Sequence, residues 1–172
     1  MLRRFFAISL PLFLLLFALG CRDQSGVEST AESNTAALSP TESIALDVYK
    51  SPTCGCCEDW ITHVDVNGFR STIHHPEDLN AVKQKFGIAP QYQSCHTGVS
   101  SDGFIFEGHI PARLIKKFLA EKPAGAIGLA VPGMPIGSPG MEMGERITPY
   151  NVLQLNKDGS TSVYAQVNAL EK

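Results

Sequence analysis

The sequence has 172 residues, 44% of them hydrophobic and 18% charged, which is the composition of an ordinary globular chain with one domain as the default. The formal net charge is −3 and Lys and Arg together number 14, so little in the chain would attract a phosphate backbone, and we expect no nucleic-acid partner. No apolar run reaches the roughly 18 residues that a membrane-spanning helix needs, which argues against an integral membrane protein.

The N-terminus has the pattern of a bacterial secretion signal over residues 1–20. Arg3 and Arg4 precede an apolar run that ends at Gly20, directly before Cys21. A small residue before a cysteine is typical of lipoprotein signals, in which Cys21 becomes the lipid-bearing first residue of the mature chain. Ordinary signal cleavage nearby is the alternative. We therefore expect a periplasmic or exported protein, a membrane-anchored lipoprotein that contacts the membrane only through a lipidated Cys21.

The rest of the chain divides into a tether, a folded domain and a tail. Residues 21–43 are rich in small polar residues and lack periodicity, which predicts a flexible tether. Residues 44–167 carry the periodic apolar segments and are long enough for a single core, and residues 168–172 form a short tail.

Apolar periodicity predicts alternating strands and helices in the domain. In chain order we expect a strand over 44–49, a helix from 56 or 57 to 67, a strand over 69–73, a helix from Pro76 to Gly87 with Glu77 and Asp78 in its first turn, a hairpin of 97–99 and 104–107, and a helix opened by Pro111. Two strand–helix units in succession favour a parallel strand pair. With a cysteine pair directly after the first strand, this order resembles the thioredoxin fold, an α/β fold with a mixed sheet flanked by helices.

After the last predicted helix the chain becomes rich in Pro, Gly and Met. The stretch 123–149 predicts a loop that is ordered or semi-ordered. Two apolar segments, 150–155 and 161–167, are separated by turn residues. They predict a C-terminal β-hairpin that packs against the domain.

The sequence Cys54-Gly55-Cys56-Cys57 lies where the first strand gives way to the first helix. Cys54 and Cys57 have C-x-x-C spacing, and the unpaired N–H groups and dipole of a helix N-terminus lower thiol pKa values and favour thiolates. Cys56 would compete for any disulfide of that pair, so the three neighbouring thiols indicate a soft-metal clamp rather than a plain disulfide exchanger. A structural disulfide with one spare thiol is the alternative.

A fourth sulfur comes from Cys95, which precedes His96 and the third predicted strand. In the thioredoxin topology the segment entering this strand faces the C-x-x-C turn, so we expect both side chains to point at the first cysteines. A buried cysteine beside a surface histidine is the alternative. Met134, Met141 and Met143 add thioethers, which suit Cu(I) better than Zn(II) or hard cations, although methionine more often serves as hydrophobic filler.

The remaining histidines give weaker signals. We interpret His63 as a surface residue, whereas His74, His75 and His109 could each serve as a metal ligand or as solvated or hydrogen-bonded structure.

Several segments in this order are shared with a known family. They are YKSPTCGCC at 49–57, Trp60, SCHT at 94–97, EGHIP at 107–111, GLAVPGMP at 128–135 and SPGM at 138–141. Together they resemble the CopG-type copper proteins, long catalogued as a domain of unknown function, over about residues 46–166. The resemblance implies a copper-responsive exported protein whose thioredoxin-like core binds Cu(I) through its cysteines. It makes Cys54, Cys56, Cys57 and Cys95 the candidate ligands, with His96 and Met134 in the second rank and Met141 and Met143 in the third.

Two classes of function follow. In the first, the protein holds copper as Cu(I) and serves copper resistance or homeostasis, with copper-efflux or copper-handling proteins as partners. In the second, it is an oxidoreductase that exchanges disulfides or cycles copper, with Cys54 and Cys57 as catalytic residues. The third neighbouring thiol, the Cys95–His96 pair and the methionine-bearing loop favour the first class. A four-cysteine Fe–S or Zn site is chemically allowed, but the thioethers and the expected export argue against it.

Overall fold

The computed structural model describes residues 43–170. The predicted signal, the lipidation site at Cys21 and nearly all of the predicted tether lie outside the described residues. Among the helices that are described, none is long and apolar enough to cross a membrane. The described elements are β1 (Ile44–Lys50), α1 (Gly55–Val66), β2 (Phe69–His74), α2 (Leu79–Lys85), the 3-10 turn η1 (Pro90–Tyr92), β3 (His96–Ser100), β4 (Ile105–Glu107), α3 (Ala112–Glu121), β5 (Ala126–Ala130), β6 (Tyr150–Asn156) and β7 (Thr161–Val167).

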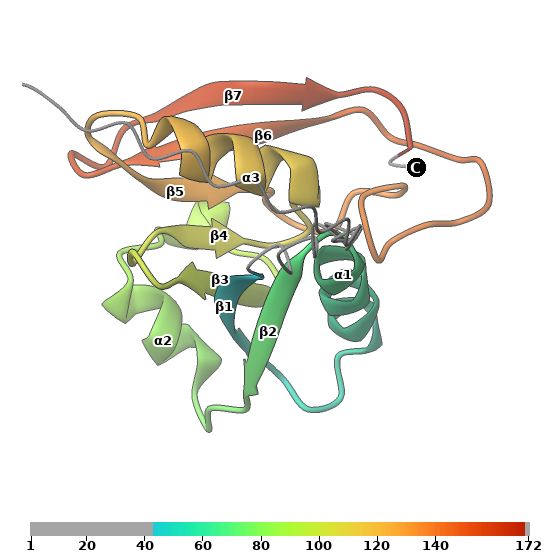
Figure 1. Ribbon diagram of the computed structural model, residues 1–172, viewed down its shortest axis with the longest axis horizontal. Coiled ribbons are helices and arrows are strands. Elements are labelled where there is room, and N and C mark those ends of the chain that lie inside the picture. The colour runs from blue at the N-terminus through green and yellow to red at the C-terminus, as the bar shows by residue number, and fades with distance from the viewer. Residues whose placement is uncertain (1–42, 171–172) are drawn as a thin grey trace, which may run out of the picture. The chain divides into compact units, whose positions relative to one another are not determined.

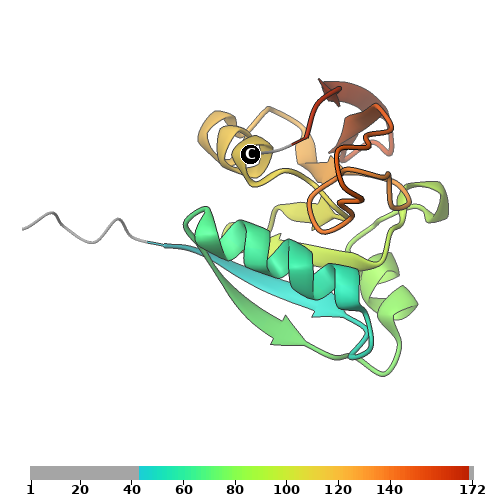
Figure 2. The same cartoon turned by 90° about the vertical axis from the view of Figure 1, so that its right-hand side faces the viewer.

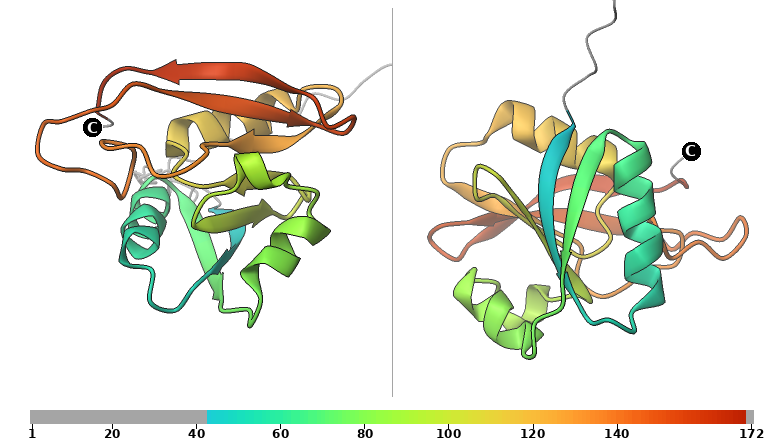
Figure 3. Two further views of the ribbon diagram at one scale, coloured as in Figure 1. Left: turned by 180° about the vertical axis from the view of Figure 1, so that it is seen from behind. Right: turned by 60° about the horizontal axis from the view of Figure 1, so that its bottom comes forward.

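These strands form one mixed sheet of seven, in the order β2-β1-β3-β4-β5-β6-β7 (Figure 1). β1 and β2 are parallel, as the strand–helix order predicts, and β4 and β5 are also parallel, whereas the other neighbours are antiparallel. The predicted C-terminal hairpin is β6 and β7, and it joins the domain by extending the sheet beyond β5 (Figure 3). The expected mixed sheet flanked by helices is confirmed.

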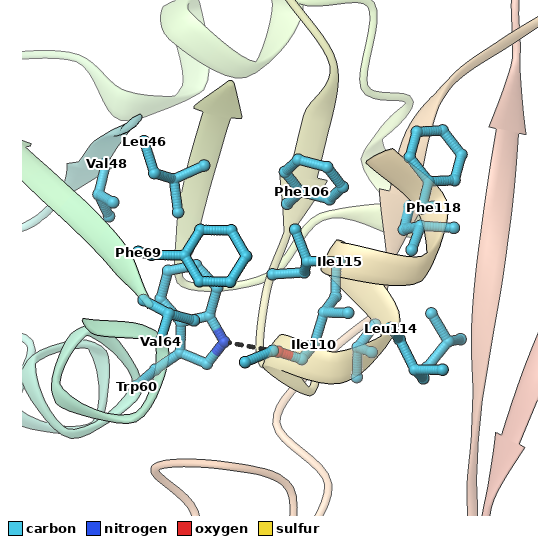
Figure 4. Close-up of a cluster of buried hydrophobic side chains, with 14 of the residues drawn as sticks. Leu46, Val48, Trp60, Val64, Phe69, Phe106, Ile110, Leu114, Ile115 and Phe118 are labelled. Carbon is cyan, nitrogen blue, oxygen red and sulfur yellow. Dashed lines mark hydrogen bonds between the residues drawn. The ribbon is translucent and has the colours of Figure 1, made fainter. Parts of the chain in front are cut away.

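The helices divide between the two faces of the sheet (Figure 2). α1 and α3 pack on one face over the apolar core, whose central members are drawn in Figure 4. Trp60 of α1 is fully buried there, and its indole N–H donates a hydrogen bond of 2.9 Å to the carbonyl of Ile110. α2 lies against the opposite face, where Lys83 reaches Glu107 of β4. Because Trp60 fixes α1 against the core, the cysteines at the start of this helix have a rigid support.

The second helix is shorter than predicted. It begins at Leu79, and Asp78 is its N-cap residue rather than a member of its first turn, with the carboxylate accepting the N–H of Ala81 at 3.0 Å. The helix ends at Lys85, with Phe86 as the C-cap. An Asp at the cap satisfies one of the free N–H groups of the helix, which is why the start falls at Leu79 and not at Pro76.

The stretch 123–149 is not a loop throughout, because it contains β5. Its sequence has few β-branched residues and includes Gly128, which normally weakens a strand. A Cβ atom at this position would lie 1.8 Å from the carbonyl oxygen of Ile105. Glycine therefore allows β4 and β5 to approach closely enough to pair, and the strand depends on a contact that local propensity does not reveal.

Candidate metal site

The cysteine motif forms the start of α1. Cys54 is the N-cap residue, with φ −83° and ψ 98°, and Gly55, Cys56 and Cys57 make up the first turn. The cap side chain makes no hydrogen bond to the N–H groups of this turn. The cysteines therefore lie at a helix N-terminus that has no side-chain cap, the position that the sequence predicts for them.

Cys95 lies beside the motif. β1 and β3 pair up to the end of β1, and since Cys95 directly precedes β3, it is placed next to the turn that follows β1. The sulfur atoms of Cys54, Cys56, Cys57 and Cys95 all lie within 4.8 Å of one another. The proximity expected from topology is therefore present.

Two of the cysteines are joined in this structure. Cys54 and Cys57 form a disulfide, while Cys56 and Cys95 are free thiols and the Cys54 and Cys56 sulfurs are 3.5 Å apart. The alternative of a disulfide with a spare thiol is thus the state described. Cys57 is fully buried, whereas Cys54 is partly accessible. Four thiolates become available to a metal only after this disulfide is reduced.

Two imidazole rings adjoin the Cys95 sulfur. His109 places Nε2 at 3.0 Å from it and His96 places Nδ1 at 3.3 Å. Nδ1 of His109 lies 2.8 Å from the carbonyl oxygen of Pro139. Because a carbonyl only accepts, Nδ1 carries the proton, and the lone pair of Nε2 is directed at the sulfur. His109 therefore belongs with this cluster, although its sequence context left its role open.

His96 keeps one nitrogen without a partner. Its Nε2 is buried and makes no hydrogen bond within the part of the chain that the structure describes. The ring packs against Trp60 with centroids 4.2 Å apart and meets His109 edge-on at 5.0 Å. The nitrogen that adjoins the Cys95 sulfur is Nδ1, so the unpaired nitrogen is the other one on the ring, Nε2.

Burial sets the protonation of these groups. It raises the pKa of the Cys95 thiol to about 12, and the neighbouring Cys56 adds to the rise. It also holds the pKa of His96 well below its ordinary value, an effect reinforced by His109 and Lys83. The pKa of His109 is lowered by burial as well. Both imidazoles are thus neutral at pH 7, the form that binds metal, whereas Cys95 is a thiol until a cation displaces its proton.

The methionine-bearing loop contacts the start of α1. The Met134 sulfur lies 4.0 Å from that of Cys56, and its side chain is 51% exposed. A Cβ atom at Gly140 would come within 2.6 Å of the Cys56 carbonyl oxygen, so the loop also packs tightly on the start of α1. Met143 is directed elsewhere, since its sulfur accepts a hydrogen bond from Arg146 at 3.3 Å. Of the two methionines whose sulfur contacts are described, the second-rank candidate Met134 is therefore the one beside the motif.

The other histidines have structural partners. Nε2 of His63 accepts the N–H of Ala112 at 3.1 Å, at the start of α3. His74 pairs with Asp47 at 2.7 Å, and His75 lies 3.2 Å from the Lys50 carbonyl oxygen. These contacts agree with a structural interpretation of the three rings. The donors described near the motif are four cysteine sulfurs, two of them in the disulfide, together with one thioether and two imidazoles, which is a set of soft and intermediate ligands.

Comparisons with known proteins agree on a family. Residues 92–141 match the profile described as "Protein of unknown function, DUF411". The solved structure titled "Copper resistance protein copG- Form 1" is 48% identical with a TM-score of 0.69, over 73% of this chain and 98% of that one. Form 2 is 47% identical with a TM-score of 0.70, over 74% and 100%. A search of curated proteins finds no match. The chain belongs to the CopG family of copper resistance proteins.

Proposed function

We propose that this protein binds copper as Cu(I) through the thiolates of Cys54, Cys56, Cys57 and Cys95 and thereby serves copper resistance or homeostasis. The observation that carries the proposal is the convergence of four sulfurs, from two segments of the chain, within 4.8 Å. Soft thiolate ligands select Cu(I). The membership of the CopG family supports copper as the cargo.

Neighbouring donors would complete the coordination. Met134 is the candidate thioether, because its sulfur is 4.0 Å from Cys56. His96 and His109 are the candidate imidazoles, since both are neutral and adjoin Cys95. A site that combines one buried and three partly buried cysteines with an exposed thioether gives an incoming ion a first contact at the surface and tighter ligands below it.

The setting of the protein is part of the proposal. The order β2-β1-β3-β4, with a parallel first pair and helices on both faces, supports a thioredoxin-like core. The secretion and lipoprotein pattern of residues 1–21 supports export and anchoring through Cys21. Proteins that deliver or export copper are the partners that such a location and cargo require.

A competition titration tests the copper proposal. The purified protein is reduced without oxygen, and Cu(I) is added against a chromophoric chelator. Wild-type protein should withdraw copper from the chelator, and serine at each of the four cysteines should weaken that withdrawal. His74→Gln is the matched control, because this ring pairs with Asp47 away from the motif. Failure of the wild-type protein to compete, or serine variants that all compete as well as wild type, would refute thiolate binding.

One observation favours a second function. The Cys54–Cys57 disulfide spans the first turn of α1, with Cys54 the more accessible sulfur. That arrangement suits a thiol–disulfide oxidoreductase in which the Cys54 thiolate attacks a substrate disulfide and Cys57 resolves the mixed disulfide. Catalysed reduction of insulin by dithiothreitol, lost on Cys54→Ser, would establish this activity. No acceleration above the uncatalysed rate would eliminate it.

A further inference from the structure

An ion pair is buried beneath the metal site, on the α2 face of the sheet. Lys83 Nζ lies 2.5 Å from Oε1 of Glu107, and the two side chains are 2% and 0% exposed. Moving two charges out of water is costly, and apolar residues of similar volume often stabilise a fold as well or better. The pair therefore calls for a role other than packing.

The carboxylate of Glu107 ends on the segment that carries Cys95. Oε1 accepts the backbone N–H of Ser94 at 2.6 Å, and Oε2 accepts the hydroxyl of Thr97 at 2.6 Å. Lys83 also donates to that hydroxyl at 3.0 Å. The residues immediately before and after the Cys95–His96 pair are thus fixed by one buried carboxylate.

Ser94 links the segment of Cys95, which Glu107 holds, to the methionine-bearing loop. Its hydroxyl donates a hydrogen bond to the carbonyl oxygen of Gly133, the residue before Met134. The N–H of Gly133 in turn donates to the carbonyl of Gln93 at 3.4 Å. The segments that bear Cys95 and Met134 are therefore joined to each other at Ser94, and Ser94 is held by Glu107.

We propose that Glu107, with its charge balanced by Lys83, is a positioning residue that holds Cys95 and, through Ser94, Met134 at the cysteine motif. This inference rests on the proposed copper binding. The hydrogen bonds of Lys83 and Glu107 described above do not involve a candidate ligand sulfur. Their effect is exerted through the backbone of Ser94, whose position determines how far Cys95 lies from the sulfurs of α1.

Two paired substitutions separate positioning from charge. Lys83→Met with Glu107→Leu removes both charges and the acceptor for the Ser94 N–H, whereas Lys83→Met with Glu107→Gln removes both charges but keeps an amide oxygen as acceptor. Cu(I) affinity from chelator competition should fall about 10–100-fold in the Leu pair, the usual effect of losing an outer-shell partner, and stay near wild type in the Gln pair. Equal affinities of the two pairs would overturn the proposal.

A cycle with Cys95→Ser tests whether the effect passes through this thiol. If Glu107 acts by placing Cys95, the Leu pair should weaken copper binding much less when Cys95 is already serine. The same loss in both backgrounds would mean a general loosening of the fold and would contradict positioning. Urea unfolding of each variant shows which of them are folded under the binding conditions.

Two further measurements keep the test decisive. If the Leu pair does not fold, Ser94→Ala removes the link to Gly133 together with a 3.9 Å contact between the Ser94 hydroxyl and the Cys95 sulfur. Its loss of copper affinity should then be smaller in the Met134→Leu background than in wild-type protein, and equal losses in the two backgrounds would contradict a link through Met134. In metal-free protein with the disulfide intact, iodoacetamide should alkylate Cys95 faster in the Leu pair than in the Gln pair. This readout is independent of copper, so wild-type protein that fails to bind Cu(I) refutes the proposed function, whereas equal alkylation rates refute the positioning.

Discussion

Replacing Lys83 by Met should strongly destabilise the fold, because it leaves the carboxylate of Glu107 buried without its cation. Lys83 Nζ lies 2.5 Å from Glu107 Oε1, and the carboxylate side chain is 0% exposed. Removing one partner of a buried ion pair costs about 3–5 kcal/mol, since an uncompensated charge stays in a low-dielectric interior. The hydrogen bonds from Ser94 and Thr97 to the carboxylate persist and offset part of that cost. We therefore expect a loss of about 3 kcal/mol in the free energy of unfolding.

Urea unfolding followed by circular dichroism measures this loss. Lys122→Met is the matched control, because Lys122 pairs with Asp102 at 2.6 Å but the two side chains are 53% and 50% exposed. Solvent screens such a pair, so the control should lose less than about 1 kcal/mol. Lys83→Met combined with Glu107→Leu should recover much of the loss, since both charges are then gone. A loss for Lys83→Met no larger than that of the control would refute the reasoning.

Four further predictions concern the site. Serine at both Cys54 and Cys57 should abolish Cu(I) binding in chelator competition. The urea midpoint should stay nearly unchanged, because a disulfide with a sequence separation of 3 constrains the unfolded chain little. Loss of folding would mean that the bond is structural. Serine at Cys95 should weaken binding without eliminating it, and an unchanged Kd would exclude its sulfur as a ligand. Iodoacetamide at about pH 8 should alkylate Cys95 more slowly in the native protein than in urea. The reason is that burial raises the pKa of this thiol to about 12, and the thiolate is the reactive form. Equal alkylation rates in the two conditions would contradict the raised pKa. Gly140→Ala should lower the free energy of unfolding in urea by about 1–3 kcal/mol, because the added Cβ would meet the Cys56 carbonyl oxygen at 2.6 Å and the φ of this residue is +83°. An unchanged midpoint would show that the loop moves away from Cys56 without cost.

The main elements of the fold could be predicted from apolar periodicity. The first strand, the helix bearing Trp60 and the final hairpin all occur where the pattern places them, because each has an apolar face that must be buried. β5 could not be found in this way. Its pairing depends on the close approach of Gly128 to Ile105, a contact between segments that sequence periodicity does not record.

The site was predictable where it follows from topology and unpredictable where it depends on distant packing. The strand order predicts Cys95 beside the motif, and its sulfur lies there. The sequence does not decide the role of His109, since its orientation is set by the carbonyl of Pro139, thirty residues further along the chain. Similarly, no local pattern pairs Lys83 with Glu107. Only the folded chain brings such polar partners together.

The oxidation state of the motif is a matter of conditions rather than of sequence. Cys54 and Cys57 are close enough to be joined as a disulfide, and the same sulfurs lie within reach of Cys56 and Cys95 for a metal. Both states are compatible with the spacing of the motif. The reduction potential of the Cys54–Cys57 pair, relative to that of the compartment, therefore determines how many thiolates are available to bind copper.

Copper K-edge X-ray absorption on reduced protein loaded with Cu(I) tests the central claim most directly, because it reports the oxidation state and the elements bound to the metal. Wild-type protein should hold Cu(I) with sulfur as the dominant scatterer. The sulfur contribution should fall in Cys95→Ser, which is expected to retain weaker copper binding, and stay unchanged in His74→Gln. Copper surrounded only by nitrogen and oxygen in the wild-type protein would contradict the account.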